Sequence, residues 1–90
     1  MTNDNFVVGA FVKSLAGREI GETFIVVGTI DKDYVYIANG DNRTIKKPKK
    51  KKIKHLQFLN LIDDEISNKI KIKRLLDSDI RKSIKSFNNN

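Results

Sequence analysis

The sequence predicts a mainly β fold, a small barrel or sandwich of about five strands, followed by one or two C-terminal α-helices. Up to residue 61, short apolar runs alternate with turn residues at close intervals, as in small all-β domains. After residue 61 the apolar residues recur every four positions, which is typical of a helix. A chain of 90 residues has room for one small domain. We therefore expect a barrel over residues 1–61, with a basic loop at 43–55, and a helical extension over 62–90.

Five segments of the first part carry the strand pattern. They are residues 9–14, 23–30, 34–38, 43–46 and 55–61. In the second segment Phe24, Val26 and Ile30 share one face. Ile25 and Val27 share the other face, so both faces are apolar and we expect this strand in the centre of the sheet.

The connections between these strands contain recognisable turn residues. Residues 31–33 are a short hairpin connection, and Asn39-Gly40-Asp41-Asn42 is the strongest turn signal because Asn-Gly readily takes positive φ angles. Pro48 has no N–H to give to a ladder. We expect strand pairing to stop there, which would leave the following lysines on an edge or in a loop.

The C-terminal part carries two helix signals. The acidic residues 63–65 suit a helix N-terminus, and Ile62, Ile66 and Ile70 recur as on one helical face. Residues 76–79 are a second start signal, followed by an apolar stripe. The stripe consists of Ile80, Ile84 and Phe87. An amphipathic helix packed on the barrel and a helix with its own binding role are both open.

The most informative local feature is a basic segment at residues 43–54, with eight basic and no acidic residues in twelve positions. These residues are Arg43, Lys46, Lys47, Lys49, Lys50, Lys51, Lys52 and Lys54, and His55 follows them. Clustering of one charge sign predicts contact with a polyanion. A solvated loop that keeps the protein soluble is the alternative. A membrane-surface role is disfavoured because no apolar anchor or lipidation motif accompanies the segment.

Three aromatic residues lie near this segment in the sequence, Tyr34, Tyr36 and Phe58. Each could stack on a nucleic-acid base or belong to the core, and Phe58 is the strongest core candidate. His55 could contact phosphate, stack on a base or simply begin a strand.

The first connection, residues 13–22, contains Gly17 and Gly21. Glycines in such a loop suit either a tight corner or the close approach of a phosphate chain, and their spacing alone does not decide. We expect Gly9, Gly17, Gly21 and Gly40 to be structurally required.

Taken in order, several of these short motifs resemble one family, the short bacterial KOW-domain RNA-binding proteins. These are related to KOW-bearing large-subunit ribosomal proteins of archaea and eukaryotes. The resemblance covers about residues 6–61 and continues weakly at 77–82. It is carried by Gly9, residues 14–18, Gly21, the strand to Val27, Tyr34-Val35, residues 38–40, Lys47-Pro48-Lys49 and Lys54-His55-Leu56. The family pattern usually has Gly-Arg-Asp-Lys-Gly where this chain has residues 17–21, so Ile20 removes a positive charge.

The resemblance implies an SH3-like (KOW) barrel whose first loop contacts RNA. Together with the clustered charge of the basic segment, this gives the expected RNA-binding residues: Lys13, Ser14, Gly17, Arg18, Arg43, Lys46, Lys47, Lys49, Lys50, Lys51, Lys52, Lys54 and His55. We expect an RNA-binding protein of the translation machinery that binds rRNA of the large ribosomal subunit. The alternative is a protein-interaction or transcription-linked KOW module in which the basic segment only assists, since one fold serves many functions.

Other function classes lack support in the composition. The chain has no cysteine and one histidine, and it carries no nucleophile or phosphate-loop motif, so we expect neither an enzyme nor a cofactor nor a metal. Asp31 and Asp33 begin like a calcium loop, but Tyr36 replaces its glycine and Asn42 its final glutamate. We expect no secretory signal in the polar N-terminus, and residues 24–30 are too few to span a bilayer. We expect a cytoplasmic monomer.

Overall fold

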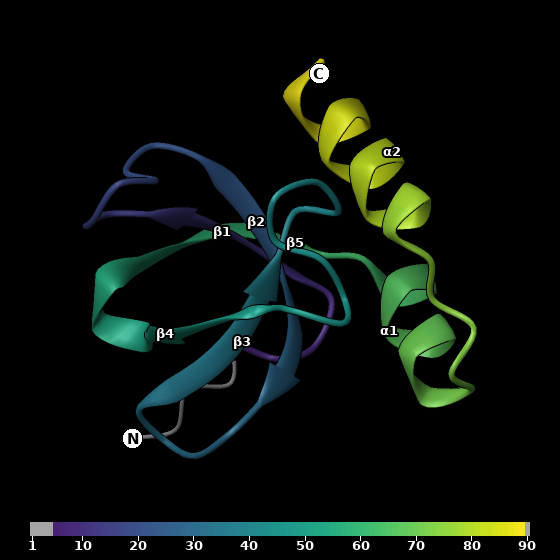
Figure 1. Cartoon of the computed structure of the whole chain (residues 1–90), viewed down its shortest axis with the longest axis horizontal. Helices are drawn as coiled ribbons and strands as arrows, with labels where there is room; N and C mark the ends of the chain where they lie inside the picture. The colour runs from purple at the N-terminus through teal and green to yellow at the C-terminus, as the bar shows by residue number, and fades with distance from the viewer. Residues whose placement is uncertain (1–4, 90) are drawn as a thin grey trace.

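Five antiparallel strands form one sheet, and two helices follow them along the chain (Figure 1). The structure is a computed structural model and describes residues 5–89. Residues 1–4 and Asn90, and with them most of the polar N-terminus discussed above, lie outside the described range. The elements are β1 (Ala10–Ser14), β2 (Thr23–Thr29), β3 (Tyr34–Ala38), β4 (Lys49–Lys52), the 3₁₀ turn η1 (Ile53–His55), β5 (Leu56–Ile62), α1 (Asp64–Lys71) and α2 (Asp77–Asn88).

The strand order is β4-β3-β2-β1-β5, so β2 is central, as the apolar pattern on its two faces predicts. Strands β1 to β4 pair as successive hairpins, whereas β5 returns to the far edge beside β1. The two edge strands, β4 and β5, are joined only by η1. The prediction of a mainly β chain with C-terminal helices is confirmed. The sheet itself is open, because among residues 5–89 no ladder joins β4 to β5.

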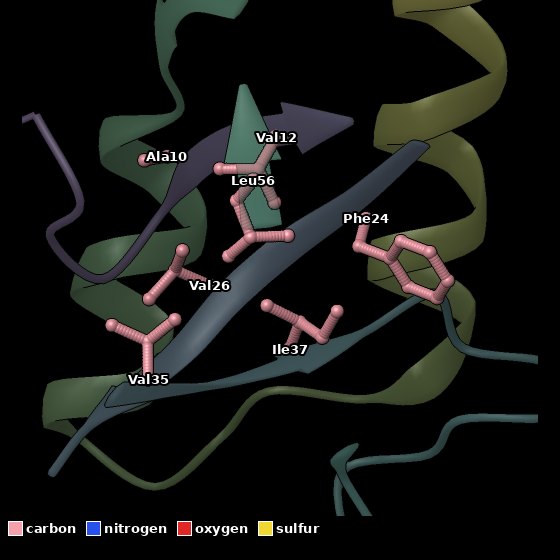
Figure 2. Packing of buried hydrophobic residues seen from close by; sticks show 7 residues of the cluster. All are labelled: Ala10, Val12, Phe24, Val26, Val35, Ile37 and Leu56. Atoms are coloured by element: carbon pink, nitrogen blue, oxygen red, sulfur yellow. The ribbon is translucent and has the colours of Figure 1, made fainter. Parts of the chain in front are cut away.

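One face of the sheet carries an apolar cluster made entirely by strands. It consists of Ala10, Val12, Phe24, Val26, Val35, Ile37 and Leu56, whose side chains converge between the strands (Figure 2). Phe58 packs against this cluster and against Phe6, with ring centroids 6.3 Å apart. Phe58 therefore belongs to the core, as expected.

The opposite face of the sheet is covered by the two helices (Figure 1). Its fully buried residues are Phe11, Ile25, Ala38, Ile66 and Ile80, and the stripe residues Ile84 and Phe87 pack against them. The Phe87 ring stacks on that of Phe11 at 4.8 Å between centroids. Burial of both sheet faces gives a small domain more apolar contact than one face allows. The helices are thus packed on the sheet.

The isoleucine spacing predicts a helical face that starts at Ile62, but the first helix begins at Asp64. Asp63 precedes α1, and its carboxylate accepts a hydrogen bond from the Ile66 N–H at 3.1 Å. Such a side-chain acceptor satisfies one of the unpaired donors of a helix N-terminus. Ile62 ends β5 and is exposed, so only Ile66 and Ile70 of the predicted face contact the core.

The backbone at the start of each helix packs closely against a glycine next to the sheet. All four predicted structural glycines have positive φ: Gly9, Gly17, Gly21 and Gly40. A side-chain carbon at Gly9 would lie 2.7 Å from the carbonyl oxygen of Asp63, and one at Gly40 would overlap that of Asp77. The Arg81 guanidinium donates a hydrogen bond to the Gly40 carbonyl. At these positions the backbones approach too closely for any other residue.

The predicted strand at 43–46 is wrong, because residues 39–48 form a loop. Its N–H groups donate to side chains instead of a ladder: that of Arg43 to Asn39 Oδ1 at 3.0 Å and that of Ile45 to Asp77 Oδ1 at 2.9 Å. The fourth strand begins directly after Pro48. The lysines do lie on an edge, but Pro48 precedes the pairing instead of ending it, so only the first part of the basic segment is loop.

Candidate nucleic-acid interface

Strand β4 consists of four lysines and pairs only with β3, at the edge of the sheet. Lys51 lies opposite Val35, whereas Lys50 lies opposite Tyr36 and Lys52 opposite Tyr34. Because successive side chains of a strand point to opposite faces, Lys51 shares the face of the strand-only core. Lys50 and Lys52 share the other face with the two tyrosines.

Lys51 is turned into the protein and is only 9% exposed. Its ammonium donates to the carbonyl oxygen of Ala16 at 2.8 Å, and the hydroxyl of buried Ser14 donates to the same oxygen at 2.9 Å. Two predicted RNA-binding side chains are therefore engaged inside the structure: Lys51 holds the first loop against β4, and Ser14 bonds to the backbone of that loop. A lysine is rarely this buried without such a partner.

A second internal contact joins the first loop to the 39–48 loop. Glu19, 7% exposed, accepts a hydrogen bond from Arg43 Nε at 3.0 Å, and Asn42 Nδ2 lies 3.5 Å from the same oxygen. This ion pair neutralises the charge of Arg43. Glu19 of the first loop thus has a structural contact, and Arg43 is less available to a ligand than its place in the basic segment suggests.

The outer face of β4 carries the positive charges of Lys50 and Lys52. The ammonium groups of Lys50 and Lys52 lie 4.7 and 5.7 Å from the centroid of the Tyr34 ring. The negative face of an aromatic ring attracts cations at such distances. Tyr34 therefore holds two like charges close together, which is an arrangement suited to neighbouring phosphates.

Lysines of the flanking segments extend this charged edge. Of the eight basic residues at 43–54, Arg43 and Lys51 are engaged internally, which leaves six. We call these six residues the lysine edge: Lys46, Lys47, Lys49, Lys50, Lys52 and Lys54. None of the six forms an ion pair with another residue in the range 5–89. Their charges are therefore available to a polyanion.

The remaining predicted residues are placed differently. Gly17 and Arg18 are exposed at the first loop, and half-buried His55 accepts the Leu15 N–H through its carbonyl oxygen at 2.9 Å. Lys13 lies away from β4, in a groove beside Arg81 and Lys85 of α2. The structure does not bring Lys13 to the lysine edge.

The tip of the first loop is partly apolar. Ile20 is 64% exposed and Leu15 46% exposed, with Arg18 exposed between them in the sequence. Arg18 is the only positive charge in the loop from Leu15 to Glu22. Phosphate contact by this loop would rest on that one side chain.

Sequence reasoning missed one basic residue near the edge. Lys73 lines a groove together with Tyr36 and Pro48, and it has a φ of 58° in the turn that ends α1. Glycine or asparagine usually occupies such a position. A lysine there gives no sequence signal for the turn, so its place near β3 was not predictable.

Within residues 5–89 no group of three or more metal-ligating side chains comes together. The helices of this range are all too short or too polar to cross a membrane. Comparison of the sequence with known families gave no matching family model, and comparison with curated proteins gave no significant match.

Proposed function

We propose that this protein binds RNA through the lysine edge. The observation that supports the proposal is that six lysines without ion-pair partners in the described chain lie in the edge strand β4 or in the segments directly before and after it. Lysine ammoniums are mobile point charges that suit phosphate oxygens and do not discriminate between bases. The lysine edge thus supplies affinity more than sequence specificity.

The KOW resemblance supports the translation machinery as the setting, with rRNA of the large ribosomal subunit as the target. It also favours an SH3-like barrel. Because η1 alone joins β4 to β5, the two sheet edges must curve toward each other, as such a barrel requires. In this proposal the protein is a cytoplasmic monomer that needs no cofactor and catalyses no reaction.

Phosphate binding of this kind has a measurable salt signature. If all six lysines of the edge contact phosphates of a single strand, log K falls by about 4 per tenfold rise in salt. Binding should therefore be tight at low salt and collapse at high salt.

Charge reversal tests the proposal while keeping Lys51, which the fold uses. We expect a variant with Lys46, Lys47, Lys50 and Lys52 changed to Glu to lose RNA binding and co-sedimentation with large subunits. Its matched control changes Lys71, Arg74, Lys82 and Lys85 to Glu, with the same change of net charge, and should keep both. Circular dichroism should show both variants folded. Unchanged co-sedimentation of the edge variant would overturn the proposal.

The exposed Leu15 and Ile20 favour a second candidate function, a protein-binding module in which the lysines only assist. Exposed apolar side chains on a rigid loop are suited to a protein partner. In this case a partner remains bound after nuclease treatment and in high salt, and Leu15→Ser with Ile20→Ser releases it. Loss of the partner after nuclease treatment alone would exclude this second function.

A further inference from the structure

A groove of about 400 Å³ lies on the outer face of β2 and β3, between the end of α1 and the 45–48 segment. Tyr36 and Gly28 line it from the sheet, Ile45 and Pro48 from the loop, and Leu75 and Lys73 from the turn after α1. Its volume lies within the range of small-molecule sites. The lining is mostly apolar, and none of its residues is acidic.

Tyr36 forms an aromatic surface in this groove. It lies opposite Gly28 in the β2–β3 pairing, and a side-chain carbon at Gly28 would be 3.4 Å from the ring. Because glycine has no side chain, the ring rests on the backbone of β2. Tyr36 remains 39% exposed, so part of the ring can be reached from solvent.

Positive charge lies on both sides of the groove. Lys46 and Lys47 are exposed between the two lining residues Ile45 and Pro48, and the Ile45 N–H is held by Asp77 at 2.9 Å. Lys73 lies on the helical side, where its N–H donates to the Ile70 carbonyl at 3.1 Å. Lys50 lies next to Tyr36 across the β3–β4 pairing.

We propose that this groove receives one unstacked base of the bound RNA, with Tyr36 as the stacking surface. The inference rests on the proposed function and specifies it: the target is single-stranded or looped RNA. The phosphates on either side of the base lie toward Lys46 and Lys50 on one side and Lys73 on the other. Proteins that recognise RNA sequence mostly bind unstacked bases, and these bases commonly stack on aromatic side chains.

An acidic apolar peptide is the other occupant with matching charge, and two observations favour the base. The groove has a volume of about 400 Å³, and both segments that border it contain lysines, Lys46 and Lys47 in the loop and Lys73 in the turn after α1, which fits a planar unit between two phosphates. A peptide would bind most readily by extending the sheet along β4, and four consecutive lysines are a known device against such pairing.

Tyrosine fluorescence tests the inference directly, because the chain has two tyrosines and no tryptophan. In a Tyr34→Phe variant only Tyr36 emits. We expect a short single-stranded RNA to quench this emission, whereas an abasic ribose-phosphate chain of equal length binds without quenching. Tyr36→Ala should weaken RNA binding by about 5- to 140-fold and leave binding of the abasic chain unchanged. Tyr36→Phe keeps the ring and should bind as the natural protein does.

The possible outcomes separate the two proposals. Equal affinity for both chains without quenching overturns the base site but leaves phosphate binding by the lysine edge intact. Binding of neither chain overturns the proposed function and the base site together. Quenching of Tyr36 by a Glu-rich apolar peptide but not by RNA also overturns the base site.

A second variant serves if Tyr36→Ala does not fold. Lys73→Asn removes a charge at the edge of the groove, and asparagine tolerates the positive φ of that position. We expect about fivefold weaker RNA binding at about 0.1 M salt, with the quenching at saturation unchanged. Unchanged affinity would show that Lys73 contacts no phosphate. It would overturn the proposed path of the RNA strand across the groove.

Discussion

Strand β4 puts the same residue type to opposite uses at neighbouring positions. On the inner face, Lys51 is buried and bonded to the Ala16 carbonyl, so its charge supports the fold. On the outer face, Lys50 and Lys52 lie over Tyr34 and form no ion pair with a described residue. A run of four lysines is therefore not one binding motif. Strand alternation and the groups opposite each side chain decide which lysines can bind and which are structural.

The largest effect should come from removing the inner lysine. Lys51→Ala leaves the Ala16 carbonyl with Ser14 as its one side-chain donor, and a hydrogen bond to a charged group contributes about 1.5 to 3 kcal/mol. We expect the free energy of unfolding in urea to fall by about 2 kcal/mol. Lys50→Ala, its neighbour on the outer face, should change it by less than about 0.5 kcal/mol. Equal losses in the two variants would remove the distinction between the faces.

The next effect concerns RNA affinity. Lys50→Ala with Lys52→Ala removes two of the six expected phosphate contacts, each contributing about fivefold at about 0.1 M salt. We expect affinity to fall by about 25-fold and the salt slope to shrink from about −4 to about −3, as measured by fluorescence anisotropy of a labelled RNA. If the Lys51→Ala variant folds, the salt slope of its RNA binding should equal that of the natural protein. A slope that shrinks in Lys51→Ala would mean that this lysine also reaches phosphate.

A substitution of Glu19 should raise the affinity for RNA, whereas the lysine substitutions lower it. Glu19→Gln removes the negative charge beside Arg43, so the guanidinium becomes available to RNA. We expect about fivefold tighter binding at about 0.1 M salt, together with a loss of unfolding free energy of up to about 1 kcal/mol. Titration with RNA and urea denaturation measure the two quantities. Weaker binding would show that the ion pair orders the loop for RNA instead of competing with it.

The smallest effect should come from the charge pair between the two helices, Lys69 and Asp79. The Leu76 N–H and then the Lys69 ammonium, each 3.0 Å away, hold the pKa of Asp79 below its ordinary value of 3.8. A lowered carboxyl pKa stabilises the fold above the ordinary value, and this contribution is lost as pH falls through the folded pKa. Asp79, chiefly through its hydrogen bond, raises the pKa of Lys69 above 10.5, so that contribution is lost only at still higher pH.

Asp79→Asn should therefore lower stability slightly at neutral pH and flatten the loss of stability on acidification below about pH 4. Urea midpoints measured across this range test the expectation. RNA affinity at neutral pH should not change, because this pair joins the two helices and lies outside the lysine edge. A change in affinity would place α2 in the binding surface.

The parts of the fold that follow from local pattern were predicted from the sequence. Strand β3 has the predicted bounds, since its alternation ends at the Asn39-Gly40 turn. The central place of β2 follows from its two apolar faces. Both features depend on residues that are neighbours in the chain.

The errors involve partners that are distant in the sequence. Residues 43–46 carry a strand pattern, but the Ile45 N–H bonds to Asp77, 32 positions away. The burial of Lys51 depends on Ala16, 35 positions away. Local patterns contain no information on such pairings. The RNA-binding roles of the lysine edge and of Arg18 stay predictions.

The placement of β5 beside β1 has a consequence for synthesis of the chain. Strands β1 to β4 can pair in turn as they emerge, but the outer edge of β1 has no partner until residues 56–62 exist. An open strand edge readily pairs with another chain, and a contact between distant residues forms slowly because a long loop must close. A chain interrupted before Leu56 would therefore be prone to aggregate. Pairing with β5 covers this edge of the apolar strand β1 and leaves β5 and the lysine strand β4 as the two outer strands.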